Sequence, residues 1–227
     1  MKKVIALMIG VVTAATGFSQ LSLGVQATGN LSDASIETVE FLDPTKNSRV
    51  LPGGGIVADI KVSPSLSLRT GVNFLQSGIK LEASMTDIPG EINEIATKGK
   101  LNMNYLQVPL NILYTTKGST QFFVGGGPYF SYAVSGKSTQ ETTMKFSDGS
   151  VVTDKEETDP FEKDDEGETY WKRTDFGVGA IAGVKLPGGF FANIGYQFSF
   201  NNLSKADDEK YRNRGLQLTV GYYLWRK

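Results

Sequence analysis

The chain has 227 residues, with 23 lysines and arginines against 24 aspartates and glutamates, and it contains neither histidine nor cysteine. A formal net charge of -1 leaves no basic surplus for binding nucleic acid. Without histidine or cysteine the chain cannot build Ser-His-Asp or Cys-His catalytic sites, imidazole or thiolate metal sites, or disulfide bonds. We therefore expect a protein that is not an enzyme and holds no cofactor.

The N-terminal segment has the pattern of a secretory signal peptide. A positively charged start, Lys2-Lys3, precedes an apolar stretch that ends at Ala15, and small residues follow it. The apolar stretch is shorter than the ~20 residues that a transmembrane helix needs, which argues against a retained anchor. The pattern predicts a signal peptide over residues 1–19, cleaved after Ser19, and one domain over residues 20–227.

Alternation of apolar and polar residues, the period of a β-strand, runs through the rest of the chain. In the first segment, for example, Leu23, Val25 and Ala27 lie on one face and polar or small residues on the other. Eight such segments are predicted as strands, at residues 21–29, 54–62, 66–74, 106–114, 122–134, 174–186, 190–200 and 216–224.

The connections between these strands alternate in length. Long loops are predicted at residues 30–52, 83–100, 137–169 and 201–213, and tight turns at residues 63–65, 117–119 and 187–189. An even number of strands with every short turn at one end is typical of a barrel that crosses a bacterial outer membrane. The predicted fold is therefore all-β, an eight-stranded antiparallel up-and-down transmembrane β-barrel. Both mature termini are then expected at the turn end, in the periplasm of a Gram-negative bacterium.

Two further patterns refine this prediction. In the third strand the alternation slips near Leu75, so that Ile79 and Leu81 continue the apolar face, which indicates a β-bulge or a strand that extends beyond the membrane. Aromatic residues near the strand ends predict two interfacial girdles, one of Tyr114, Phe122, Phe190, Tyr222 and Trp225, the other of Tyr105, Tyr132, Tyr170, Trp171 and Phe200. A soluble lipocalin-like barrel that binds a small ligand is the alternative, since its strands also alternate.

Several sequence blocks resemble a known family. Tyr105-Leu106-Gln107-Val108-Pro109-Leu110, Phe123-Val124-Gly125-Gly126-Gly127-Pro128-Tyr129 and Asp175-Phe176-Gly177-Val178-Gly179-Ala180 are similar to motifs of the PorT-like outer-membrane β-barrel proteins of Bacteroidetes. The resemblance extends over essentially the whole mature chain and implies an eight-stranded outer-membrane barrel. One departure is the C-terminus, where Trp225 is followed by Arg226-Lys227 rather than closing the chain with an aromatic residue.

Polar and charged residues fall on the strand face that would point into the lumen. An interior of eight strands is just wide enough for side chains, so we expect these groups to pair and plug the barrel rather than to line an open pore. The predicted lumen residues are Asp59, Lys61, Arg69, Gln107, Asn111, Asp175, Lys185, Asn193, Gln197 and Arg214.

An acidic stretch, residues 154–168, lies in the longest predicted loop. Its closely spaced carboxylates Asp164, Asp165, Glu166 and Glu168 are weak candidates for a divalent-cation site. They lack the ligand spacing of a calcium-binding loop, and a solvated extracellular loop, bridged by cations to lipopolysaccharide, is the simpler interpretation.

The expected function is therefore non-enzymatic. The barrel would contact outer-membrane lipid and lipopolysaccharide and present its long loops for binding, adhesion or membrane integrity, with a protein partner at those loops. A narrow pore or transport component and an accessory subunit of a secretion machine are the alternatives.

Overall fold

The computed structural model describes residues 20–37, 45–86, 92–163, 169–206 and 210–226. The predicted signal peptide lies outside these ranges. The described residues form ten strands, namely β1 (Leu21–Glu37), β2 (Thr45–Asn47), β3 (Arg49–Lys61), β4 (Leu66–Thr86), β5 (Ile92–Thr115), β6 (Gln121–Phe146), β7 (Val151–Thr158), β8 (Thr174–Lys185), β9 (Phe190–Ser199) and β10 (Lys210–Arg226). No helix in this part of the chain is long and apolar enough to cross a membrane.

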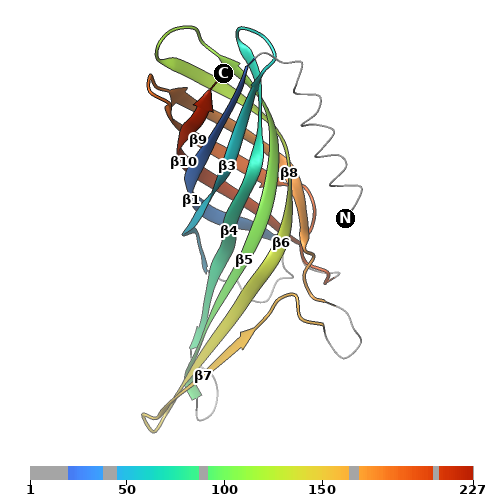
Figure 1. Ribbon diagram of the computed structural model, residues 1–227. Helices are drawn as coiled ribbons and strands as arrows, with labels where there is room; N and C mark the ends of the chain where they lie inside the picture. The colour runs from blue at the N-terminus through green and yellow to red at the C-terminus, as the bar shows by residue number, and fades with distance from the viewer. Residues whose placement is uncertain (1–19, 38–44, 87–91, 164–168, 207–209, 227) are drawn as a thin grey trace.

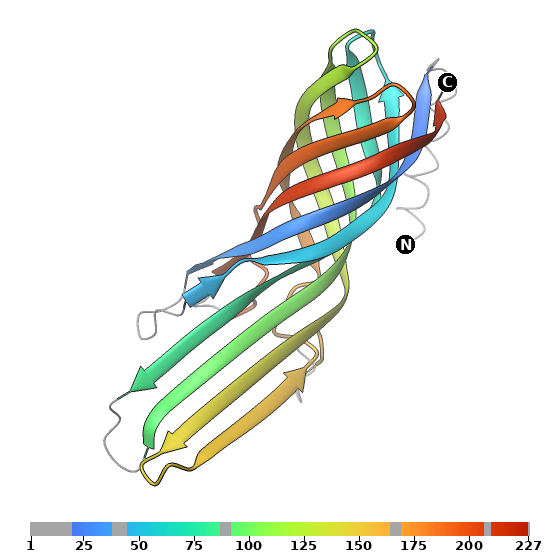
Figure 2. The same cartoon turned by 90° about the vertical axis from the view of Figure 1, so that its left-hand side faces the viewer.

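Eight of the strands close into an antiparallel barrel. The hydrogen-bonded order is β4-β3-β1-β10-β9-β8-β6-β5, and β5 pairs with β4 to complete the ring. The first and last strands of the barrel are neighbours, since Ser22 pairs with Arg226. Figures 1 and 2 show the ring as a tilted cylinder, with the described ends of β1 and β10 beside the short turns. The predicted eight-stranded antiparallel barrel is thereby confirmed.

The barrel wall has an apolar outer face. Leu110, Ile112, Val124 and Leu218 are each 45–63% exposed, although they belong to regular paired strands. Alternate residues on the same strands point inward and are buried, including Leu113 and Phe123. Large apolar side chains that stand in rows on an outer surface need an apolar medium, which is the arrangement of a barrel in lipid.

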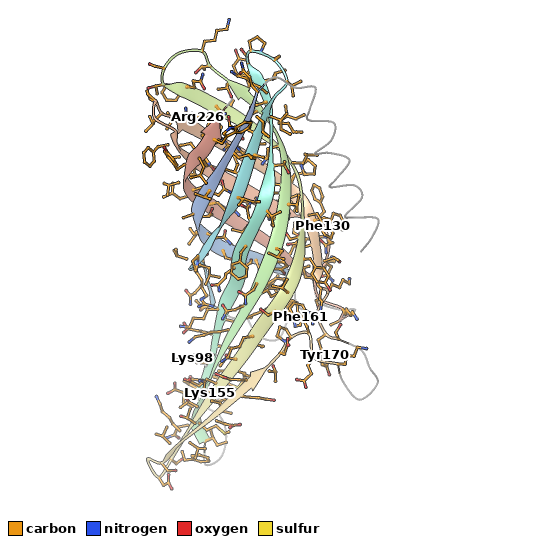
Figure 3. The ribbon with its side chains drawn as sticks, viewed as in Figure 1. Lys98, Phe130, Lys155, Phe161, Tyr170 and Arg226 are labelled. Atoms are coloured by element: carbon orange, nitrogen blue, oxygen red, sulfur yellow. The ribbon has the colours of Figure 1, made fainter. Side chains whose placement is uncertain are left out.

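The aromatic girdle beside the short turns is predicted correctly, and the girdle at the opposite end of the barrel is predicted only in part. Tyr132, Tyr170 and Phe200 are about half exposed or more, and Figure 3 shows Phe130 on the outside of the wall near this level. Tyr105, however, is buried inside the barrel, and the ring of Trp171 packs edge-on against Tyr211 with 5.0 Å between centroids. These two residues therefore belong to the interior rather than to a girdle.

The three tight turns lie where the sequence predicts them, and we call this side of the barrel the turn end. The first is closed by a hydrogen bond from Val62 N to the carbonyl oxygen of Leu66, and the third by one from Leu186 N to that of Phe190. Gly118, Gly188 and Gly189 have positive φ angles of 129°, 89° and 107°, a backbone conformation that disfavours any side chain. The opposite side is called the loop end.

At the loop end the strands run far beyond the predicted segments. Residues 30–37 continue β1, residues 83–86 and 92–100 are strand in β4 and β5, and residues 137–146 continue β6. The predictions of long irregular loops at 30–52, 83–100 and 137–169 are therefore largely wrong. Residues 80–86, 92–100 and 139–146, together with β7, form a sheet that extends away from the barrel, which we call the projecting sheet (Figure 2).

The predicted bulge near Leu75 is also wrong, whereas the extension of this strand is confirmed. The pairing of β4 with β5 keeps one register from Leu66 to Thr86. Leu75 and Ile79 keep the inward phase of the strand and are 5% and 1% exposed. The apolar character changes sides because the barrel interior itself becomes apolar at the loop end, in a cluster of Ala34, Ile79, Leu101, Met103, Tyr105, Ala133, Phe161, Leu203 and Tyr211.

Candidate functional site

An ion cluster fills the barrel near the turn end. Arg69 on β4 donates two hydrogen bonds to the carboxylate of Asp59 on β3, at 2.7 and 2.9 Å, and a third to the hydroxyl of Tyr223 at 2.7 Å. Lys185 on β8 donates to the same carboxylate at 2.7 Å. Asp59 and Arg69 are 5% and 3% exposed, so the pair is shielded from water. Strands from opposite walls of the ring therefore meet at one carboxylate.

Aromatic rings pack around this cluster. The guanidinium carbon of Arg69 lies 4.6 Å from the ring centroid of Phe123 and 5.0 Å from that of Phe191. Phe191 also packs against Tyr223, with ring centroids 4.8 Å apart. The cation is held between π faces as well as by its carboxylate, which stabilises a desolvated charge. Together these side chains form a layer across the barrel interior.

Neutral amides occupy the middle of the barrel. The side-chain nitrogen of Gln107 donates to Gln197 at 3.0 Å and to the Ser131 hydroxyl at 3.1 Å, and Gln217 donates to Gln197 at 3.1 Å. Asn111 and Asn193, which the sequence also assigns to the lumen, are 7% and 8% exposed. Amides can both donate and accept, so they fill a narrow interior with mutually satisfied groups.

Asp175 lies closer to the loop end and has a different environment. Its carboxylate accepts hydrogen bonds from the Ser199 hydroxyl at 2.6 Å and from the Asn213 side-chain amide at 2.9 Å. Asn213 also donates to the hydroxyl of Tyr105 at 3.2 Å. The apolar cluster of the loop end begins at this level, and beyond it the barrel interior is filled mainly by apolar side chains.

Two of the predicted lumen charges lie outside the packed interior, Arg214 on the outer face and Lys61 at the turn-end mouth. The structure puts Arg214 on the outer face of β10, where its guanidinium contacts Asp33 of β1 at 2.6 Å and its side chain is 42% exposed. The prediction that it points into the lumen is wrong, because Arg214 has the same strand phase as the outward Leu216. Lys61 is exposed at the turn-end mouth and donates to the Gln20 side chain at 2.6 Å.

The acidic stretch is only partly a loop. Residues 154–158 belong to β7, which pairs with β6, and the candidate metal ligands Asp164, Asp165, Glu166 and Glu168 lie outside the described residues. Within the described ranges no group of three or more aspartates and glutamates is arranged to hold a metal ion.

The projecting sheet has two chemically different faces. Met85, Ile95, Met144 and Val152 are direct cross-strand partners and make one apolar row over four strands, with Met85 52% and Val152 50% exposed. We call this set the apolar row. It lies on the face that continues the barrel interior, because Met85 has the strand phase of the inward Ile79.

The other face of the projecting sheet is charged. Its cross-strand partners alternate in sign along the row Glu82, Lys98, Glu141 and Lys155. Figure 3 labels Lys98 and Lys155 on this sheet, well below the barrel wall. Opposite charges in direct cross-strand positions stabilise a sheet that water reaches from both sides.

Sequence reasoning missed the projecting sheet, although one signal for it was present. Residues 147–150 form a tight turn between β6 and β7, in which Gly149 has a φ of 85° and donates to the carbonyl oxygen of Phe146. Asp-Gly between two β-branched segments is a strong hairpin signal, and Asp148-Gly149 is such a pair. The threonine-rich segments on either side are the strands.

A closed barrel with an apolar outer wall, a polar and ion-paired interior, and strands that extend at one end defines a transmembrane β-barrel of the outer membrane. The family described as "Outer membrane protein beta-barrel domain" matches residues 15–205, and the chain belongs to this family. A search of curated proteins found no match.

Solved outer-membrane barrels are similar to this chain at low identity. Neisserial surface protein A has 15% identity and a TM-score of 0.39, covering 90% of this chain and 99% of that one. OprG from Pseudomonas aeruginosa has 11% identity and a TM-score of 0.41, covering 89% and 93%. Ail of Yersinia pestis, solved with the heparin analogue sucrose octasulfate, has 11% identity and a TM-score of 0.32, covering 89% and 98%.

Proposed function

We propose that this protein is a non-enzymatic outer-membrane barrel that uses the projecting sheet to bind a partner outside the cell. The observation that carries the proposal is the apolar row, in which Met85 and Val152 are about half exposed and Ile95 and Met144 are partly exposed, at the end of a paired and charge-balanced sheet. A row of large apolar side chains in water is unfavourable unless a partner covers it. β7 offers further contact, since among the described strands it pairs with β6 alone.

The orientation of the barrel is part of the proposal. Short turns face the periplasm in bacterial outer-membrane barrels and longer extensions face outward. The described ends of β1 and β10 would then lie in the periplasm, after removal of a signal peptide over residues 1–19. The domain would extend over residues 20–227, and its outer wall would contact lipid and lipopolysaccharide.

The finer family assignment rests on three sequence blocks. Residues 105–110 lie on β5, residues 123–129 on β6 and residues 175–180 on β8, and these strands are neighbours in the ring. PorT-like character and a Bacteroidetes source are proposed from the residues of these blocks, which lie together on one wall of the barrel. An accessory role in a secretion machine follows from that resemblance as the second candidate, and crosslinking in native membranes tests it by identifying the partner.

The proposed function is tested by cell-surface adherence. A Gram-negative host that displays the protein is compared with one that displays a variant in which all four residues of the apolar row are changed to threonine. Threonine keeps the β-propensity of these positions but removes most of their apolar surface. The matched control neutralises the opposite face with Glu82→Gln, Lys98→Gln, Glu141→Gln and Lys155→Gln.

We expect the wild-type protein and the control to promote adherence to other cells or to matrix-coated surfaces, and the threonine variant to lose this effect. A heat-modifiable gel shift of outer-membrane fractions checks that every variant folds. Equal adherence of the threonine variant and the wild type would contradict the proposed surface. A soluble periplasmic protein with no gel shift would contradict the barrel in the membrane.

A further inference from the structure

A cavity opens into the barrel from the turn end, and we call it the turn-end vestibule. Its described lining comes from the ends of β1, β3, β4, β5, β6, β8 and β10 and from the turns between them. The residues that matter here are Lys61, Ser67, Thr115, Lys185, Tyr223 and Arg226. Figure 3 labels Arg226 at this end of the barrel. Asp59 is one of the lining residues and is bound by Arg69, so the buried ion cluster lies at the inner end of the vestibule.

The charge of the vestibule is positive. Lys61, Lys185 and Arg226 line it, and Asp59 is the one carboxylate among its described lining residues. That carboxylate already receives both hydrogen bonds of the Arg69 fork and one from Lys185, so Lys61 and Arg226 are the lining cations that remain outside this ion cluster. The cations thus outnumber the carboxylate in a recess with low-dielectric walls, and such a recess concentrates anions.

Two buried hydroxyl groups provide an independent observation. Ser67 and Thr115 are 5% and 8% exposed, and both line the vestibule. Neither Ser67 Oγ nor Thr115 Oγ1 has a hydrogen-bond partner among the described residues. Both oxygen atoms are themselves buried, and a buried hydroxyl without a partner is unfavourable, so each gains a hydrogen bond when it turns toward an acceptor in the vestibule. Hydroxyls donate readily to an anionic oxygen.

We infer that the turn-end vestibule is a binding site for an oxyanion, of the class of a phosphate group. Lysine and arginine supply charge-assisted hydrogen bonds to phosphate oxygens, and the two hydroxyls supply neutral donors deeper in the recess. The site lies at the opposite end of the barrel from the projecting sheet, so it adds a second binding activity on the other side of the membrane. It does not depend on the proposed surface function.

Two kinds of molecule carry a phosphate group to this side of the membrane. A soluble periplasmic molecule can carry the phosphate, or it can belong to the headgroup of a phospholipid. Both sources are within reach because the outer wall beside the vestibule carries exposed apolar residues such as Leu66 and Leu186, which place the rim at the edge of the lipid.

The experiment uses the full barrel folded in a maltoside detergent, which contains no phosphate, and inorganic phosphate as the probe in isothermal titration. The first variant is Lys61→Gln with Arg226→Gln, and both of these side chains are exposed, outside the buried ion pair. The second is Ser67→Ala with Thr115→Val, which removes only the two hydroxyls. The matched control is Lys172→Gln, an exposed lysine at the loop end that does not line the vestibule.

We expect each double variant to bind phosphate at least about tenfold more weakly than wild type, because each removes two hydrogen-bond donors and tenfold corresponds to a loss of only about 1.4 kcal/mol. The Lys172→Gln control should keep wild-type affinity. Absence of saturable phosphate binding to the wild type would overturn the inference. Equal loss in the control would also overturn it, because the binding would then be a general surface effect.

A second arm separates the two sources. The titration is repeated with the barrel in nanodiscs made of phosphatidylglycerol and phosphatidylethanolamine. If a lipid headgroup occupies the vestibule, inorganic phosphate will bind more weakly there than in maltoside, because it must compete. If a soluble molecule is the natural ligand, the affinity will be the same in both. Either result supports an oxyanion site and identifies its source.

Discussion

The barrel and the projecting sheet share strands β4, β5 and β6 but meet different surroundings. Inside the ring, one face of each strand contacts lipid and the other a lumen packed with ion pairs, amides and apolar side chains. In the projecting sheet neither face is covered by lipid or by a packed lumen, and Met85 and Val152 of the apolar row are about half exposed. The same three paired strands therefore form part of the membrane barrel at one end and an accessible surface at the other.

The largest expected effect concerns the barrel interior. Arg69→Ala leaves Asp59 buried with only Lys185 and Tyr223 as partners, and breaking a buried pair in this way destabilises a protein by about 3–5 kcal/mol. Urea unfolding of the refolded barrel measures the loss. The matched control is Arg214→Ala, which breaks an Asp-Arg pair on the outer face, where such pairs contribute about 0–1 kcal/mol. Equal losses would show that the position of the pair does not matter.

The same Arg69→Ala variant tests whether the lumen is plugged. Lys185, Phe123 and Phe191 still fill the turn-end layer in this variant, so we expect no conductance in planar bilayers from the variant or the wild type. A new conductance in the variant would mean that the ion pair closes a pore. A narrow pore or transport component would then be the better proposal than a plugged barrel that only binds at the cell surface.

A second comparison uses two residues on one face of β4. Ile79 is 1% exposed in the apolar cluster of the loop end, whereas Met85 is 52% exposed in the apolar row. Ile79→Ala should destabilise the barrel by about 2–5 kcal/mol, because it removes buried methyl groups and leaves a cavity. Met85→Ala should change stability by less than about 0.5 kcal/mol. A large effect of Met85→Ala in urea unfolding would mean that the apolar row is part of the folding core.

The same contrast explains how far the sequence could predict this molecule. Lipid allows only apolar side chains on the outer wall, so residues such as Leu110, Ile112 and Leu218 reveal the strands, their phase and the turns between them. Where lipid ends, that constraint ends too. Thr139, Thr142 and Thr143 then occupy a strand in which the hydrophobic alternation has disappeared.

The alternation of residues along the strands predicts which side chains point into the lumen, but not which hydrogen-bond partners they find there. Asp59 and Arg69 are cross-strand neighbours once the turn at residues 63–65 is known, so their pairing follows from register. The contributions of Lys185 and Tyr223 come from strands more than a hundred residues away in the chain, and only the closed ring brings them together. Arg214 was misassigned because its strand begins with polar residues, which hide the phase until Leu216.

A smaller effect is expected at the tip of the projecting sheet. Gly149 adopts a φ of 85°, so Gly149→Ala forces a side chain into the left-handed region at a cost of about 1 kcal/mol. The β6–β7 hairpin should open more often, which hydrogen exchange of the β7 amides will detect. The urea midpoint of the barrel should not change. Wild-type exchange in the variant would show that the turn does not limit the stability of this hairpin.

The smallest effect is a pH dependence confined to β7. The carboxylate oxygens of Glu157 lie 2.7 Å from Nζ of Lys137 on β6 and 3.2 Å from Nζ of Lys155. The hydrogen bonds from these two ammonium groups hold the pKa of the Glu157 carboxyl below its usual range. A carboxyl whose pKa is lowered by folding stabilises the folded hairpin above its unfolded pKa, and the contribution disappears over the interval from the unfolded pKa down through the lower folded pKa. Protection factors of the β7 amides, corrected for intrinsic exchange, should decline over this interval. In Glu157→Gln that decline should be weaker while the barrel amides behave as in wild type. If the variant kept the full decline, other carboxylates of the strand would be responsible, and the cross-strand contact with Lys137 would have no measurable role.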